Sequence, residues 1–216
     1  MKKRATKAVV LSIFFLALIG FSASAYLVYN HYAPPLAGSF CDVGETISCS
    51  YVNTSVFSLF LNVPVALLGM IWCFIAAGMA LHAQKRPEAM QGIVLWSIIG
   101  MASVVYFITA EIILQALCPL CTLAHATVVL IAALSIWTFR TTKQKFSEKH
   151  FKRVGRTWII PILILTLIPF IAYNISFSEQ KNYDSFAQCV ADRGVNMYGS
   201  FRCGVCAKER ALLGDS

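Results

Sequence analysis

Charge is scarce in this sequence, and basic residues dominate what charge there is. Of its 216 residues only 13% are charged, whereas soluble domains average about 25%, and 18 Lys and Arg face 10 Asp and Glu. Residues 30–60 contain no Lys or Arg at all. A composition this poor in charge argues against a soluble fold and favours a chain surrounded mostly by lipid.

Long apolar runs take the place of charged surface. Five runs of roughly 18 to 26 residues are each long enough to cross a hydrocarbon core about 30 Å thick. They cover residues 9–29, 61–81, 92–117, 119–139 and 158–175. Because unpaired backbone groups are too costly in lipid, helices are the only plausible structure for these runs. The predicted fold class is therefore an all-α integral membrane protein with five transmembrane helices.

The basic residues predict the orientation of these helices. Most of them precede the first run, separate the second from the third, or precede the fifth. They are Lys2, Lys3, Arg4, Lys7, Lys85, Arg86, Arg140, Lys143, Lys145, Lys149, Lys152, Arg153 and Arg156. The positive-inside rule then places the N-terminus in the cytoplasm, and residues 30–60, Cys118 and everything after Phe177 outside. Since topology explains the basic charge, we expect no nucleic-acid partner.

The first apolar run has a competing interpretation. Lysines, an apolar stretch and Ser22-Ala23-Ser24-Ala25 are also typical of a signal peptide with its cleavage site. However, the apolar stretch continues through residues 26–29 and is long enough to span the membrane. We therefore favour an uncleaved first helix, whereas a mature N-terminus at Tyr26 would indicate cleavage.

Cysteines are concentrated on the predicted outer side. Seven of the eight lie there or at its membrane boundary, and only Cys73 lies within a span, where a small apolar packing role is favoured. The seven are Cys41, Cys49, Cys118, Cys121, Cys189, Cys203 and Cys206. Extracytoplasmic compartments permit disulfides, so these residues are candidates for disulfide chemistry.

Cys118-Pro-Leu-Cys121 is the strongest local motif. It stands at a predicted helix start, where free N–H groups and the helix dipole favour the thiolate of the first cysteine, and Pro119 suits the first turn. A staple between two helices and half of a zinc site are the alternatives. Zinc would need four converging ligands, and His125 is the only nearby imidazole, so we expect no metal.

Two further cysteine pairs accompany this motif. Cys41 and Cys49 flank a short segment containing Gly44, which is typical of a flexible loop that can move a disulfide. Cys203-Gly-Val-Cys206 follows residues 195–201, which are predicted to form a strand, and this order resembles the opening of a thioredoxin-like fold. Three dithiols on one face of a membrane indicate an electron relay.

Several residues complete a pattern around these cysteines. They are Cys41-x7-Cys49, Ser55, Pro64-Val-Ala-Leu-Leu-Gly69, Tyr106 through Glu111, Cys118-Pro-Leu-Cys121, Phe186-Ala-Gln-Cys189 and Met197-Tyr-Gly199. The pattern covers essentially the whole chain. It resembles the vitamin K epoxide reductase family, in the form of its prokaryotic members fused to a thioredoxin-like domain. The resemblance implies a four-helix bundle around a quinone, with a fifth helix leading to the thioredoxin-like module.

The resemblance also implies a function and an electron path. The chain would be a quinone-dependent thiol–disulfide oxidoreductase that makes disulfides outside a prokaryotic cell (inner) membrane, with ubiquinone or menaquinone as cofactor. Cys121 would face the quinone, Cys118 would exchange with Cys49, and Cys41 would exchange with a thioredoxin-like partner protein or domain. Within this chain, that partner pair would be Cys203 and Cys206.

Quinone contacts are expected from a further set of residues. They are Ser55, Asn62, Val65, Glu111 and His125. Relatives often carry Asn where this chain has Val65, and Asn62 lies one helical turn earlier. His125, four residues after Cys121, is suited to hydrogen-bond a quinone oxygen or supply a proton, or else is a polar group satisfied in the bundle. Glu111 lies seven residues before Cys118 on nearly the same helix face, with either a proton-handling or a structural role.

The predicted organisation has four parts. A membrane core at 1–140 includes the outer loop 30–60, and a basic cytoplasmic loop at 141–157 leads to a fifth helix at 158–177. Residues 178–216 are expected to be a linker and the incomplete start of a thioredoxin-like domain, because only ten residues follow Cys206. A separate soluble partner would then supply the electrons.

Other functions remain as alternatives. The chain would be a quinone or vitamin K epoxide reductase in its own right, a membrane conduit carrying electrons outward, or a non-catalytic scaffold stapled by disulfides. The conduit would need cysteines within reach of the cytoplasm, and none is predicted there. A transporter is disfavoured because charged rings, inverted repeats and paired broken helices are lacking.

Overall fold

The computed structural model describes residues 2–33, 35, 39–44, 46–142, 148–178 and 184–194. Its helices and strands, with 3-10 turns marked η, are α1 (Lys2–Tyr32), α2 (Cys49–Thr54), η1 (Val56–Ser58), β1 (Leu59–Phe60), β2 (Val63–Pro64), α3 (Val65–Lys85), η2 (Pro87–Ala89), α4 (Met90–Leu114), α5 (Pro119–Thr141), α6 (Glu148–Ser178) and α7 (Asp184–Asp192). The five long helices α1, α3, α4, α5 and α6 are each apolar and long enough to cross a membrane. The predicted fold class is confirmed: this is a multi-pass, all-α membrane protein.

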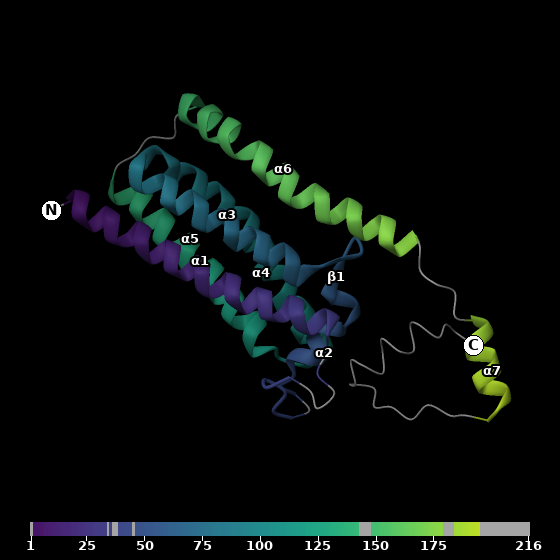
Figure 1. Ribbon diagram of the computed structural model, residues 1–216. Coiled ribbons are helices and arrows are strands. Elements are labelled where there is room, and N and C mark those ends of the chain that lie inside the picture. Colours follow the sequence, from purple (N-terminus) through teal and green to yellow (C-terminus); the bar gives the residue numbers. More distant parts are fainter. Residues whose placement is uncertain are drawn as a thin grey trace.

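Helices α1, α3, α4 and α5 form a bundle (Figure 1). Helix α1 packs against α3 and α5, while α4 closes the bundle by packing against the same two helices. The core between them contains large side chains with almost no exposed surface. The largest are Ile13, Ile75, Met90, Ile93 and Ile131. Because lipid is as apolar as these side chains, close packing rather than exclusion of water holds such helices together.

Two glycines show how closely the helices approach. A Cβ atom placed on Gly20 of α1 would lie 2.5 Å from Thr127 Oγ1 on α5 and 2.8 Å from Cys73 Sγ on α3. Gly100 of α4 leaves equally little room, since its Cβ would lie 2.7 Å from the indole ring of Trp72. Small residues at helix crossings are the usual means of close packing in membranes.

A pair of tryptophans joins α3 to α4. The rings of Trp72 and Trp96 stack with centroids 6.3 Å apart and an interplanar angle of 11°. Each indole N–H donates to the backbone carbonyl of the other residue, at 3.2 Å from Trp72 and 3.1 Å from Trp96. Both polar N–H groups are therefore satisfied inside the bundle, which is the condition for placing Trp at membrane depth.

Two helices are shorter at one end than the apolar runs predict, because a left-handed residue interrupts each run. The second run was expected to be helical from residue 61, but Leu61 and Asn62 have φ of 50° and 65° and form the turn of the β1–β2 hairpin. The third run was expected to continue to residue 117, but α4 ends at Leu114 because Gln115 is left-handed. Hydropathy does not depend on backbone conformation, so it predicts that α3 starts too early and that α4 ends too late.

Helix α6 begins at Glu148, ten residues before the apolar run that predicts it. It runs beside α3 on the outside of the bundle (Figure 1). Trp158 fixes this contact by lying over Gly78, where a Cβ atom would be 2.7 Å from its ring. Most other side chains of its apolar part, such as Ile160 and Ile168, are exposed, which suits a helix with lipid on most sides.

Candidate functional site

The first cysteine pair stands at the start of α5. Cys118 is the N-cap of this helix, Pro119 is its first residue, and a disulfide joins Cys118 to Cys121. The sulfur of Cys118 accepts a hydrogen bond from the backbone N–H of Cys121 at 3.1 Å. Free N–H groups and the helix dipole therefore converge on Cys118, as the sequence predicted, and they stabilise its thiolate when the pair is reduced.

The second pair lies in the loop that follows α1. A disulfide joins Cys41 to Cys49, and Cys49 opens the short helix α2 behind its N-cap Ser48. Cys49 and Cys118 have no exposed surface, and Cys41 is only 5% exposed. Thiols in solution cannot reach Cys49 or Cys118 in this arrangement, so exchange at these two sulfurs must take place within the protein.

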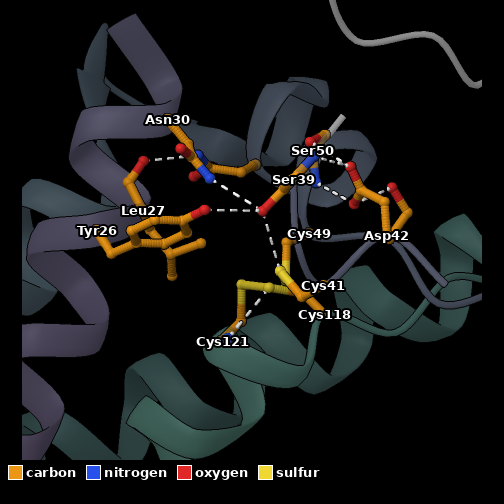
Figure 2. Close-up of a disulfide and its surroundings, with 12 residues drawn as sticks. Tyr26, Leu27, Asn30, Ser39, Cys41, Asp42, Cys49, Ser50, Cys118 and Cys121 are labelled. Atoms are coloured by element: carbon orange, nitrogen blue, oxygen red, sulfur yellow. Dashed lines mark hydrogen bonds between the residues drawn. A yellow bond between two sulfur atoms is a disulfide. The ribbon is translucent and has the colours of Figure 1, made fainter. Parts of the chain in front are cut away.

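A short parallel bridge brings the two pairs together. Ile47 pairs with Leu117, with hydrogen bonds from Ser48 N–H to Leu117 O at 3.0 Å and from Leu117 N–H to Thr46 O at 2.8 Å. Cys49 is the first cysteine after Ile47, and Cys118 is the first cysteine after Leu117. Both disulfides consequently share one buried cluster (Figure 2), whose members and packing partners include Leu27, Cys41, Cys49, Val52, Ala116, Cys118 and Cys121.

Asp42 holds the disulfide loop in shape. Its carboxylate accepts hydrogen bonds from the N–H of Ser39 at 2.6 Å and of Ser50 at 3.0 Å, and from the hydroxyls of Ser48 at 2.9 Å and Ser50 at 2.6 Å. Partial burial disfavours the charge, but these hydrogen bonds outweigh it and lower the pKa of Asp42 below its ordinary value. The loop is therefore fixed around a carboxylate that is ionised at neutral pH.

Polar groups of α1 reach the same loop. The hydroxyl of Ser39 lies 3.3 Å from the sulfur of Cys41, and it is held by Asn30 Nδ2 at 3.1 Å and by the hydroxyl of Tyr26 at 3.3 Å. Asn53 of α2 donates to the carbonyl of Leu27 at 2.7 Å. Sequence reasoning missed these residues and Asp42. The one available signal was the Ser-Cys-Ser sequence at 48–50, which is typical of a helix N-cap.

Glu111 contacts Cys118, but not through the helical arrangement that the sequence predicts. The expectation that it lies on one helix face with Cys118 is wrong, because α4 ends at Leu114 and the chain turns back at Gln115. The turn lets the carboxylate of Glu111 accept a hydrogen bond from the N–H of Cys118 at 3.2 Å. Contact between the two residues therefore comes from the helix connection rather than from helical periodicity.

His125 lies one helical turn after Cys121, as predicted. Its ring stacks on Phe107 of α4 with centroids 4.8 Å apart, and Phe107 touches Tyr106, which in turn contacts Phe57 of η1. The imidazole forms no hydrogen bond within the part of the chain that the structure describes. An aromatic surface next to an available hydrogen-bonding nitrogen fits the ring and the carbonyl oxygens of a quinone.

For the other three residues expected to contact the quinone, the structure shows no hydrogen bond with Cys121 or His125 among the described residues. Ser55 caps the end of α2 and donates its hydroxyl to Val52 O at 2.8 Å. Val65 begins α3, next to Ala66, which packs against the cysteine cluster. Asn62 does not lie one helical turn before Val65 as expected, since it occupies the exposed hairpin turn.

An apolar groove of about 490 Å³ lies on the opposite side of α5 from His125. It is formed by α1, α5 and the disulfide loop, and it is lined by Phe15, Leu18, Ile19, Tyr26, Phe40, Leu120 and Leu123, together with Ser22 and Ala23. It provides a second surface beside the first turn of α5 on which an apolar molecule can rest.

The chain contains four other cysteines. Cys203 and Cys206 lie outside the described residues. Cys189 is exposed on α7, and Cys73 is buried where α1, α3 and α5 meet. No group of three or more His, Cys, Asp or Glu side chains suited to a metal occurs in residues 2–33, 39–44, 46–142, 148–178 and 184–194.

A helical membrane bundle with two disulfides buried together at one end defines a class of multi-pass membrane proteins that carry a dithiol–disulfide centre. The family model for the vitamin K epoxide reductase family matches residues 11–136, which run from α1 into α5 and include both disulfides. The match covers more than half of the chain, so the chain belongs to this family. It is therefore an oxidoreductase from a family that is generally quinone-linked. No curated protein matches the sequence.

Proposed function

We propose that this protein is a quinone-dependent thiol–disulfide oxidoreductase that makes disulfides for proteins folding outside the cytoplasm. The observation that carries the proposal is the burial of both disulfides in one cluster, joined by the bridge between Ile47 and Leu117. Two structural staples need not touch. Sulfurs that exchange must meet, and the bridge brings Cys49 and Cys118 to the same place.

The exchange proceeds through one mixed disulfide. The thiolate of Cys49 attacks Cys118, which forms the Cys49–Cys118 bond, breaks Cys118–Cys121 and releases Cys121 as a thiolate. Cys41 then attacks Cys49, restoring Cys41–Cys49 and releasing Cys118 as a thiolate. Two electrons pass to the helix-start pair. The N–H groups at the start of α5 favour the second step because they stabilise the departing thiolate of Cys118.

The electron acceptor, a quinone, would lie along α5. A bound quinone supplies the final acceptor for two electrons and two protons. Cys121 and His125 lie one turn apart, and the ring of Phe107 supports His125, so these three residues would hold the quinone head. The available nitrogen of His125 would orient a carbonyl oxygen. The apolar surroundings suit either ubiquinone or menaquinone.

Electrons enter at Cys41, from a thioredoxin-like protein or domain. Phe40 and Val43 flank Cys41 and Asp42 and are both exposed, which provides an apolar surface for such a partner. The partner pair would be Cys203 and Cys206 or the dithiol of a separate protein. The distribution of basic residues favours the outer face of the membrane for this end of the bundle, and the resemblance to prokaryotic family members suggests a prokaryotic cell membrane.

One assay tests the proposed function. Purified protein is mixed with a reduced thioredoxin-like protein and a soluble quinone, and quinone absorbance is followed. We expect thiol-dependent quinone reduction that is lost in Cys121→Ala and kept in the control Cys73→Ala, whose thiol lies away from both pairs. Absence of quinone reduction in the unmodified protein, or full activity in Cys121→Ala, would contradict the proposal. Consumption of vitamin K epoxide in the same assay would instead identify an epoxide reductase.

A further inference from the structure

Asp42 connects the two ends of the disulfide loop. Its carboxylate accepts a hydrogen bond from the N–H of Ser39, two residues before Cys41. It also accepts hydrogen bonds from Ser48 and Ser50, the two residues that flank Cys49. Figure 2 shows the carboxylate among these donors, next to the disulfide but not touching either sulfur through a hydrogen bond. The loop is therefore closed twice, once by the Cys41–Cys49 bond and once by hydrogen bonds to one carboxylate.

The second closure does not depend on the disulfide. None of the four hydrogen bonds uses a cysteine side chain, so they can persist when the Cys41–Cys49 bond is broken. Hydrogen bonds to an ionised acceptor are also stronger than neutral ones. Ser39 adds a link toward the reacting atoms, because its hydroxyl lies 3.3 Å from the sulfur of Cys41.

The reaction needs such a link at one particular stage. While Cys49 is bonded to Cys118, Cys41 carries a free thiolate and must attack Cys49 to complete the exchange. The Cys41–Cys49 bond is then broken, and without another link Cys41 would sample many positions. A tether that keeps it beside Cys49 raises its effective concentration and makes the attack faster.

We propose that Asp42 is a positioning residue that holds Cys41 within reach of Cys49 while Cys49 is bonded to Cys118. The inference rests on the proposed function and adds to it the residue that sets the rate of the second exchange. Asp42 forms no bond to a reacting sulfur. It acts through the backbone of Ser39 and through Ser48 and Ser50, which fix the start of α2.

The test measures the mixed disulfide directly. Asp42→Asn keeps the size of the side chain but removes its charge and one acceptor oxygen. During turnover with a reduced thioredoxin-like protein and a soluble quinone, samples are quenched in acid, free thiols are alkylated, and the Cys49–Cys118 peptide pair is quantified by mass spectrometry. We expect resolution of the mixed disulfide to slow about tenfold and its steady-state amount to rise accordingly. Asp192→Asn, at the exposed end of α7, is the matched control.

A double variant separates positioning from a merely structural effect. In Cys41→Ser the mixed disulfide cannot be resolved by Cys41, so adding Asp42→Asn should change its amount no further. If Asp42 only stabilised the loop, Asp42→Asn would instead lower formation of the mixed disulfide in both backgrounds, and the inference would be overturned. Ser50→Ala removes one donor to Asp42, the hydroxyl, but keeps the backbone N–H donor and the charge of Asp42, and we expect a smaller change in the same direction.

The inference and the proposed function fail in different ways. If the unmodified protein neither reduces quinone nor forms any Cys49–Cys118 bond, the proposed function is wrong. If the unmodified protein reduces quinone, and Asp42→Asn and Ser50→Ala both resolve the mixed disulfide as fast as the unmodified protein does, only the role of Asp42 is wrong.

Discussion

The carboxylate of Glu111 accepts a hydrogen bond from the backbone N–H of Cys118 at 3.2 Å. Glu111 belongs to the last turn of α4, and Cys118 caps the start of α5, so this bond closes the sharp connection between the two helices. The N–H of Cys118 precedes α5 and cannot bond within that helix. An acidic side chain inside a membrane span therefore has a definite partner in the cysteine cluster.

Substitution of Glu111 separates its structural role from a proton-handling role. Glu111→Gln keeps an acceptor oxygen for Cys118, whereas Glu111→Ala leaves that N–H without its partner. We expect Glu111→Ala to lower the free energy of unfolding by about 1–3 kcal/mol and Glu111→Gln by less than about 1 kcal/mol, measured by denaturant unfolding in detergent. If Glu111 also handles protons, Glu111→Gln will slow quinone reduction while folding normally. Unchanged turnover would leave the hydrogen bond as its whole role.

Removing Cys121 should trap the exchange intermediate. In Cys121→Ser, Cys118 has lost its partner, and its thiolate can attack Cys49, releasing Cys41. We expect a Cys49–Cys118 peptide pair after digestion without reductant, because the two residues share one buried cluster. Cys73→Ser is the matched control and should keep both native disulfides. A Cys121–Cys49 bond accumulating in Cys118→Ser at the same level would contradict the order of exchange.

Quinone affinity should depend on His125 rather than on the groove across α5. His125→Ala removes the available nitrogen beside Phe107, and we expect the KM for a soluble quinone to rise about tenfold while the rate with excess quinone falls less. Leu123→Ala alters the groove on the other side of the helix and serves as the control. A larger rise in KM for Leu123→Ala than for His125→Ala would move the quinone to that groove.

Gly100 should tolerate no side chain. A Cβ atom there would lie 2.7 and 2.8 Å from atoms of the Trp72 ring and 2.8 Å from Val128 Cγ1. The ring cannot shift freely because its N–H is bonded to the carbonyl of Trp96. We expect Gly100→Ala to destabilise the bundle by about 1–3 kcal/mol in thermal or denaturant unfolding. At Gly155 the nearest atom is 3.7 Å away, so Gly155→Ala should be neutral or slightly stabilising.

The sequence predicts those parts of the fold that depend on hydrophobic length alone. Five runs gave five helices, because any long apolar segment in lipid must satisfy its backbone internally. It misplaced the start of α3 and the end of α4, since the left-handed residues Asn62 and Gln115 delay or end a helix without changing its hydropathy. The sequence predicts that Glu111 and Cys118 share a helix face, whereas the two residues meet across the connection between α4 and α5.

The sequence predicts those parts of the candidate site that depend on residues adjacent in the sequence. Cys118 at a helix start follows from the neighbouring Pro119, which the first turn of a helix favours. The network around Asp42 does not follow in the same way, because its donors surround the carboxylate only after the chain has folded back between Ser39 and Ser50. Tertiary hydrogen bonds of this kind leave little trace in a single sequence.

The bridge between Ile47 and Leu117 makes the spacing of the chain part of the geometry of the cysteine cluster. The bridge fixes the position of each cysteine, because Cys49 follows Ile47 by two residues and Cys118 follows Leu117 by one. Side chains alternate along extended backbone, so one residue inserted or deleted between a bridge residue and its cysteine would turn that cysteine's sulfur away from the sulfur of the other pair. A substitution at Ile47 or Leu117 keeps the backbone bonds and the count. Changes in length are therefore less tolerable in these two short intervals than changes in residue type.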